Sequence, residues 1–157
     1  MEKIEEFLEK KDAYNKLGID IRDNAGGNIS YRKDFLLPYL LTETKSVTNH
    51  MFFKDGKRSR DILKLEKANY EEIEDIDLDS MDLDHKEDLK DFAFYKEDYL
   101  EVKNKEDYGF DKDIYLLVNE NVFSAAEGLA SFAKNTGFAK LVGKRTGGDG
   151  ITLGLIN

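Results

Sequence analysis

Two short apolar segments, each followed by a polar turn and a helical pattern, constrain the fold of this chain more than any other feature. The first is Leu17–Ile21, and the second is the uninterrupted apolar run Ile114–Val118, which is typical of a strand buried in a parallel sheet. Helical patterns follow over about 29–41 and 125–135, and a further strand is expected at 138–142. Strand–helix–strand units in this order predict an α/β fold with right-handed crossovers.

The middle of the chain carries the whole charge imbalance. Residues 55–112 hold 20 acidic and 11 basic side chains, and the other residues hold 13 of each sign, so the net charge of −9 resides in this segment. The segment keeps apolar side chains such as Ile73 and Phe92, so it is too apolar for a disordered tail. We expect an acidic insertion at about 55–112, with a helix over part of 82–102.

Local patterns predict three further elements. Residues 2–14 place apolar side chains among Glu and Lys at helical spacing, and residues 45–53 are rich in β-branched and aromatic side chains, as strands are. A last strand is expected over 151–156.

Composition excludes several function classes. A net charge of −9 repels phosphates, and no apolar run approaches the ~20 residues of a membrane helix, so we expect no nucleic-acid partner and no membrane segment in this chain. The absence of cysteine excludes disulfides and thiolate chemistry. Asp75, Asp77 and Asp79 resemble the start of a calcium loop, but Ser80 replaces its glycine and Lys86 its final glutamate. We expect neither a metal nor a cofactor.

Two turns are candidates for chemistry. After the first strand, Gly26 and Gly27 leave a backbone that can aim amide N–H groups at a developing oxyanion, although glycines also serve ordinary loops. After the second strand, Ser124 begins a helix three residues before Glu127. Ser-x-x-Glu is a capping box, which needs no catalysis, but a serine at this place is also suited to act as a nucleophile.

Three segments together resemble the C-terminal processing (tail-specific) serine peptidases. They are Leu17–Gly27, Ile114–Glu127 and Leu141–Gly150, in the order that this family shows. The resemblance implies an α/β core of the ClpP/crotonase-like kind, built from ββα units. It also implies that Ser124 is the nucleophile and that the amides of Ala125 and of Gly26 or Gly27 form the oxyanion hole, with Glu127 as a helix cap or support.

The general base departs from the family pattern. The family pairs its serine with a lysine in the glycine-rich loop, and that position holds Asp149 here, which is no substitute for a neutral amine at neutral pH. Lys144 and Arg145 match variable positions and are expected to be solvated surface charges. His50 and His85 match no catalytic position of a related branch that uses a histidine base, so both are expected to be structural or surface residues.

The resemblance also suggests that residues 1–157 are a partial peptidase core, possessing an incomplete catalytic set and lacking flanking parts of a larger protein. The first hypothesis is a serine-type endopeptidase that cleaves polypeptides through an acyl-enzyme; in this family the full-length proteins are often exported or attached to the cell envelope. The alternative is a non-catalytic peptide-binding or assembly module that retains the fold without the lysine. A third hypothesis, an acyl-CoA enzyme on the crotonase fold, is disfavoured because that chemistry needs no serine at position 124.

Overall fold

The computed structural model describes residues 2–65, 69–81 and 86–148, and the chain divides into two compact units. The first unit combines Met1–Val47 with Glu101–Asn157, and the second is Thr48–Leu100. The second unit therefore overlaps the acidic segment 55–112 but begins and ends earlier than that segment does. The predicted strand over 151–156 lies outside the described residues.

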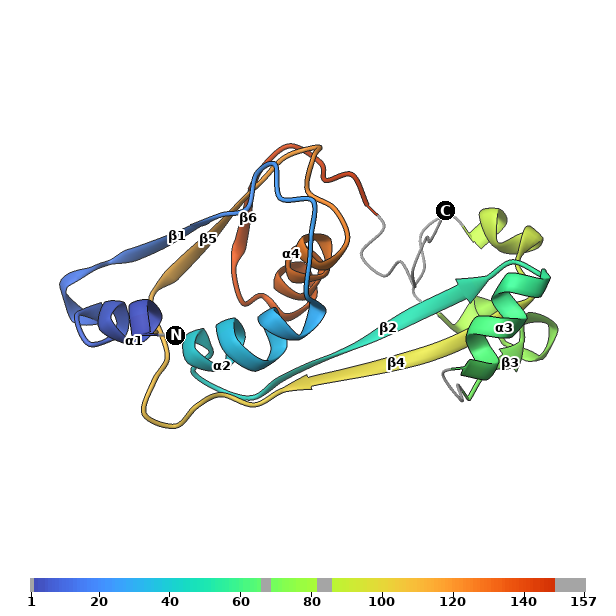
Figure 1. Cartoon of the computed structure of the whole chain (residues 1–157), viewed down its shortest axis with the longest axis horizontal. Coiled ribbons are helices and arrows are strands. Elements are labelled where there is room, and N and C mark those ends of the chain that lie inside the picture. The colour runs from blue at the N-terminus through green and yellow to red at the C-terminus, as the bar shows by residue number, and fades with distance from the viewer. Residues whose placement is uncertain (1, 66–68, 82–85, 149–157) are drawn as a thin grey trace. The chain divides into compact units, whose positions relative to one another are not determined.

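A three-stranded parallel sheet forms the centre of the first unit (Figure 1). Its order is β1 (Lys16–Asp20), β5 (Asp113–Val118) and β6 (Lys140–Gly143), so β5 pairs with a strand on each side. The alternate residues of β5 that point into the core are almost fully buried: Ile114, Leu116 and Val118. The parallel arrangement confirms the predicted α/β fold, and it brings the carboxyl ends of all three strands to one edge of the sheet.

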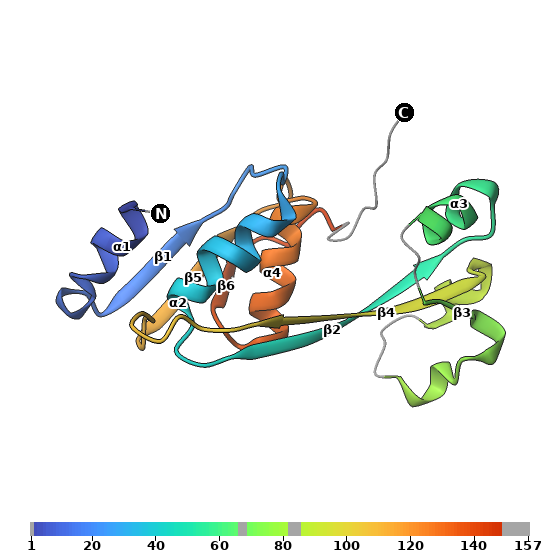
Figure 2. The same ribbon diagram turned by 60° about the horizontal axis from the view of Figure 1, so that its bottom comes forward.

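Helices and single helical turns complete the first unit (Figure 2). Helix α4 (Ala125–Thr136) packs against β5 and β6 through an apolar face made of Ala126, Leu129, Ala130, Phe132 and Ala133. It ends at Gly137, whose left-handed φ of 65° is the usual way to terminate a helix. A π-helical turn over Tyr31–Leu36 continues into α2 (Leu37–Leu40), as the helical pattern over 29–41 predicts.

The amino-terminal helix is shorter than predicted. Helix α1 spans Glu2–Leu8, and a separate 3-10 turn follows at Lys11–Ala13 in place of a helix over 2–14. Among the described residues, no helix is long and apolar enough to cross a membrane.

The second unit is built on a sheet of order β2-β4-β3. Its strands are β2 (Lys45–Phe53), β4 (Phe94–Val102) and the short β3 (Glu71–Glu72), which pairs antiparallel with β4. Helix α3 covers Lys57–Leu65. Three 3-10 turns occupy much of the remaining acidic sequence, at Ile73–Asp75, Leu78–Ser80 and Lys86–Asp91.

The predicted helix within 82–102 is wrong. Residues Phe94–Val102 form strand β4, and the only helical structure described there is the 3-10 turn Lys86–Asp91; residues 82–85 lie outside the described residues. Along much of β4, more and less exposed side chains alternate with a period of two, which a strand on a sheet produces and a helix does not. The dense charge of this segment conceals that alternation in the sequence.

Candidate active site

Ser124 lies on a strained turn between β5 and α4. Its backbone angles are φ 53° and ψ −123°, and the Ala126 N–H donates to the Phe123 carbonyl oxygen at 3.2 Å. These angles and this bond define a type II′ turn with Ser124 at the position that normally requires glycine. A serine held in this region carries backbone strain of about 1–3 kcal/mol, which is characteristic of functional sites.

The capping box predicted for Ser124 and Glu127 does not form. An N-cap residue needs extended backbone angles so that its side chain reaches the amides of the first turn, and the positive φ of Ser124 is incompatible with that geometry. Among the described residues, the Ser124 side chain makes no capping hydrogen bond. Glu127 instead accepts a hydrogen bond from the Thr146 hydroxyl at 2.9 Å, between Oγ1 and Oε1.

The double-glycine loop packs directly against the Ser124 turn. The Phe123 N–H donates to the Asn24 carbonyl oxygen at 3.1 Å. A Cβ atom at Gly26 would lie 2.7 Å from the Ser124 Cβ and 2.9 Å from the Ala125 nitrogen, and the φ of Gly26 is 102°. Only glycine fits there, so the close approach of the two loops depends on this residue.

The candidate oxyanion donors differ in their bonding. The Gly26 N–H donates to the Asn24 side-chain oxygen at 2.9 Å. Ala125 is the first residue of α4, and the first amides of a helix have no acceptor within the helix. Ala125 and Gly27 both line a pocket of about 380 Å³, together with the apolar side chains Ile21, Leu36, Ala126 and Leu129 and the side chain of Arg32.

The glycine-rich loop after β6 contacts the same turn from another direction. The Gly147 N–H donates to the Val122 carbonyl oxygen at 3.1 Å, and Thr146 holds Glu127 of α4. The three segments that carry the family resemblance therefore meet around Ser124, although the first and the second of them lie about ninety residues apart in the sequence.

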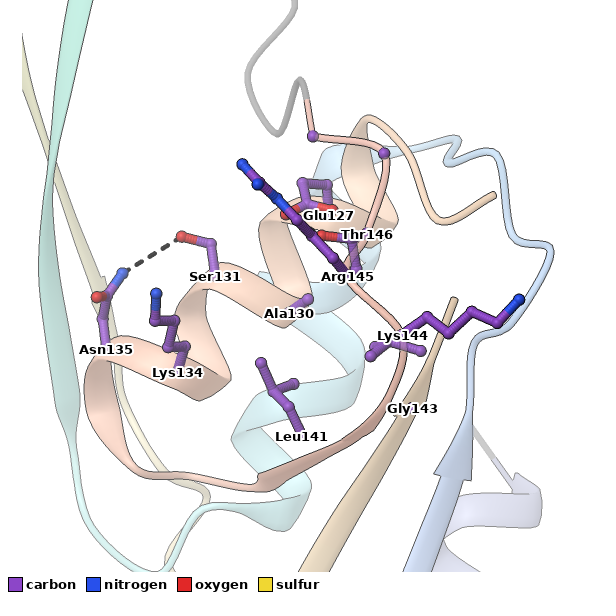
Figure 3. A pocket seen from close by; sticks show the side chains of 13 residues that line it. Glu127, Ala130, Ser131, Lys134, Asn135, Leu141, Gly143, Lys144, Arg145 and Thr146 are labelled. Atoms are coloured by element: carbon purple, nitrogen blue, oxygen red, sulfur yellow. Dashed lines mark hydrogen bonds between the residues drawn. The ribbon is translucent and has the colours of Figure 1, made fainter. Parts of the chain in front are cut away.

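A second pocket, of about 730 Å³, lies between α4 and this loop (Figure 3). Its lining includes Glu127, Ser131 and Thr146, and Figure 3 shows the Lys144 side chain extending away from the side chains of α4. The Lys144 ammonium pairs with Glu120 at 2.9 Å, and this hydrogen bond raises the pKa of Lys144. Lys144 is therefore a charged surface side chain, as the sequence suggests, and not a neutral amine.

The structure describes only two of the other side chains considered as bases, His50 and Arg145. Asp149 and His85 are outside the described residues. His50 lies on β2 in the second unit, where its Nδ1 is 2.8 Å from the Tyr95 hydroxyl. That hydroxyl donates to Glu97 at 2.9 Å, and burial together with Glu97 raises the pKa of Tyr95 to about 12. Arg145 is exposed, and an arginine side chain offers hydrogen-bond donors but no acceptor, so it is no candidate base.

Sequence reasoning missed a cluster made of Asp23, Asn119 and Asn121. The Asp23 carboxylate accepts hydrogen bonds from the Asn119 and Asn121 side-chain amides at 2.9 and 2.7 Å, and these bonds lower the pKa of Asp23. A signal was present in the sequence, because the three residues follow directly after two strands whose parallel pairing places their carboxyl ends side by side.

Arg22 and Asp20 form an ion pair beside this cluster. Arg22 donates from Nε and a terminal nitrogen to the two oxygens of Asp20, at 2.9 and 2.7 Å. This fork, with a further bond from the Arg22 N–H, lowers the pKa of Asp20 to about 2.

Comparison with known proteins identifies the family to which the chain belongs. The sequence profile of peptidase family S41 matches residues 1–155, so the chain belongs to that family. The resemblance to C-terminal processing peptidases, stated above from three sequence segments, is thereby confirmed. No curated protein matches the chain.

Solved structures of similar fold include several peptidases. The photosystem II D1 C-terminal processing protease is 17% identical to this chain with a TM-score of 0.51. The match covers 94% of this chain and 27% of that protein. Mature CPAF complexed with lactacystin is 20% identical with a TM-score of 0.54, and the match covers 92% of this chain and 34% of that protein. A putative peptidase from Parabacteroides merdae is 19% identical with a TM-score of 0.55, and the match covers 88% of this chain and 33% of that protein. The chain thus spans between 27% and 34% of the length of these proteins.

Proposed function

We propose that this chain forms the nucleophile-bearing part of a serine-type endopeptidase, with Ser124 as the nucleophile. The observation that carries the proposal is the meeting of three loops at the strained Ser124 turn, where the candidate oxyanion loop is in van der Waals contact with the serine. Membership of peptidase family S41 supports the same chemistry.

The proposed reaction is acyl transfer in two stages. The Ser124 hydroxyl oxygen attacks the carbonyl carbon of a peptide bond while a general base takes the hydroxyl proton. The amides of Ala125 and Gly27 stabilise the oxyanion of the tetrahedral intermediate, and losing one such donor costs about 3 kcal/mol of transition-state stabilisation. The C–N bond then breaks, the leaving amine takes the proton, and water hydrolyses the acyl-enzyme to free the serine.

The pocket beside these amides is suited to one side chain of a polypeptide substrate. Ile21, Leu36 and Leu129 give it an apolar lining, and its 380 Å³ accommodates a medium-sized residue. We propose that it receives the residue on the acyl side of the cleaved bond.

A second candidate function is a non-catalytic peptide-binding or assembly module. Two observations favour it: Asp149 occupies the family's lysine position, and Lys144 is committed to Glu120. Such a module would bind peptides in the same pocket without cleaving them, and removal of the Ser124 hydroxyl would leave peptide binding unchanged.

Peptide hydrolysis tests the proposal. A mixture of peptides is incubated with the protein, with Ser124→Ala and with Ser131→Ala, and the products are identified by mass spectrometry. Ser131 is the matched control because it lies on the same helix, where its hydroxyl accepts a hydrogen bond from Asn135. Cleavage that Ser124→Ala abolishes and Ser131→Ala retains supports the endopeptidase. Binding without cleavage by any variant supports the non-catalytic module.

A further inference from the structure

Among the described residues, Asp23 and Ser124 are the only two non-glycine residues with a positive φ, at 61° and 53°. They lie on different loops, 101 positions apart in the sequence, and hydrogen bonds connect those loops. We propose that Asp23 is a positioning residue, which holds the Ser124 turn in the conformation that presents the hydroxyl for reaction. This inference rests on the proposed role of Ser124 as nucleophile.

The first contact is between side chains. The Asp23 Oδ1 accepts from Asn121 Nδ2 at 2.7 Å and from Asn119 Nδ2 at 2.9 Å, so one carboxylate oxygen binds both ends of the segment 119–121. In return the Asp23 N–H donates to Asn119 Oδ1 at 3.0 Å. These two hydrogen bonds fix the orientation of the Asn119 amide, because its oxygen must face the Asp23 N–H and its nitrogen must face the Asp23 carboxylate.

The second contact is through the backbone. The left-handed conformation of Asp23 turns the chain so that the carbonyl of the next residue, Asn24, accepts the Phe123 N–H at 3.1 Å. Phe123 precedes Ser124, and its own carbonyl closes the type II′ turn by accepting from Ala126. Both the side chain and the backbone of the Asp23 turn therefore restrain the residues that enter the strained serine.

Ionisation of Asp23 strengthens this restraint. A charged acceptor forms shorter and stronger bonds than a neutral one, and the two asparagine amides stabilise the charged form of the carboxyl. Asp23 has no role in proton transfer in this proposal. It acts through residues 119–123 on the geometry of Ser124.

Substitutions can separate the two ways in which Asp23 restrains the Ser124 turn, through its backbone conformation and through its side chain. Asp23→Gly permits the same positive φ but removes the carboxylate, whereas Asp23→Asn keeps an acceptor oxygen and a residue type that tolerates this conformation. Asn121→Ala removes the shorter of the two donors. Asp20→Asn is the matched control, since Asp20 ends β1 three residues before Asp23 and bonds to Arg22.

The rate of fluorophosphonate labelling of Ser124 and amide hydrogen exchange of residues 121–125 are measured for each variant, with melting temperature alongside. We expect Asp23→Gly and Asn121→Ala each to slow labelling at least tenfold and to speed exchange. The double variant should be labelled no more slowly than the slower of the two single variants, because both substitutions break the same interaction. Asp23→Asn should recover much of the rate, and Asp20→Asn should match the unmodified protein.

Two results overturn the inference: an unchanged exchange rate in Asp23→Gly, or additive effects in the double variant. Absence of labelling in the unmodified protein contradicts the proposed function instead, and hydrogen exchange then still decides whether Asp23 restrains the turn. In a further outcome, the labelling rate falls in proportion to the melting temperature, and by the same relation in Asp20→Asn and Asp23→Gly. That result shows general destabilisation of the protein and also overturns the inference.

Discussion

Gly26 lies so close to Ser124 that no side chain fits at position 26: a methyl group there would lie 2.7 Å from the Ser124 Cβ and 2.9 Å from the Phe123 carbonyl oxygen. Real Cβ atoms essentially never approach other atoms this closely. The double-glycine loop is thus a direct neighbour of the candidate nucleophile, and the predictions below follow from this contact and from the hydrogen bonds around it.

Gly26→Ala should destabilise the protein by about 2 kcal/mol or more, because alanine is strained at a φ of 102° and its methyl group collides with backbone atoms. Urea denaturation measures the loss. Gly137→Ala is the control: it has a positive φ of 65° but open space around the added Cβ, so it should cost only about 1 kcal/mol. An equal loss of unfolding free energy in both variants would show that the close approach of Gly26 to Ser124 adds nothing to the cost of the substitution.

Ser124→Gly should increase the free energy of unfolding by about 0.5–1 kcal/mol, because glycine relieves the strain at a φ of 53°. Ser124→Ala should change it little, since no capping bond is lost, whereas the loss of a capping serine costs about 1 kcal/mol. Thermal or urea unfolding measures both variants. A Ser124→Gly variant that is less stable than the Ser124→Ala variant would contradict the strained turn.

The Thr146 hydroxyl should be required for stability of the glycine-rich loop. Thr146→Val removes the donor to Glu127, whose other carboxylate oxygen is buried and has no partner among the described residues, so a loss of about 1–3 kcal/mol is expected. Thr146→Ser keeps the donor and should recover most of the stability. Urea midpoints of the three proteins test this, and the account is wrong here if valine is as stable as serine.

Acid titration should reveal the Asp20–Arg22 fork. The pKa of Asp20 is lowered to about 2 in the folded protein, against about 3.9 for an unperturbed aspartate. A lowered folded pKa gives stability that is present above the unfolded value and is lost as the pH falls through the folded value. The contribution should therefore disappear between about pH 4 and pH 2. Asp20→Asn should flatten the dependence of stability on pH in that window, and an unchanged slope would contradict the assignment.

The sequence predicts the first unit well, because its strands and its long helix carry strong local patterns. The strand over Ile114–Val118 and the helix Ala125–Thr136 are found almost where the sequence places them. In the second unit, the strand predicted over 45–53 is confirmed as β2, but the prediction fails at β4. Strand β4 is made mostly of charged and aromatic residues, whose alternation is weak in the sequence, and it lies between β2 and β3 in its sheet.

The sequence predicts which residues form the candidate site, but it does not predict their geometry. Ser124, Gly26 and Ala125 are recognisable from the family segments, but the positive φ of Ser124 depends on contacts with loops distant in sequence. The same holds for Asp23, since its bonds to Asn119 and Asn121 form only when β1 and β5 pair. A local motif such as Ser-x-x-Glu therefore predicted a cap that the tertiary contacts override.

The central claim is that Ser124 is an activated nucleophile, and the site of a covalent adduct tests it most directly. The protein is incubated with a fluorophosphonate, digested, and the modified peptide is sequenced by mass spectrometry. The account predicts one adduct, on Ser124, that is absent from Ser124→Ala and retained in Ser131→Ala. Labelling on another residue, or labelling that persists in Ser124→Ala, would contradict it.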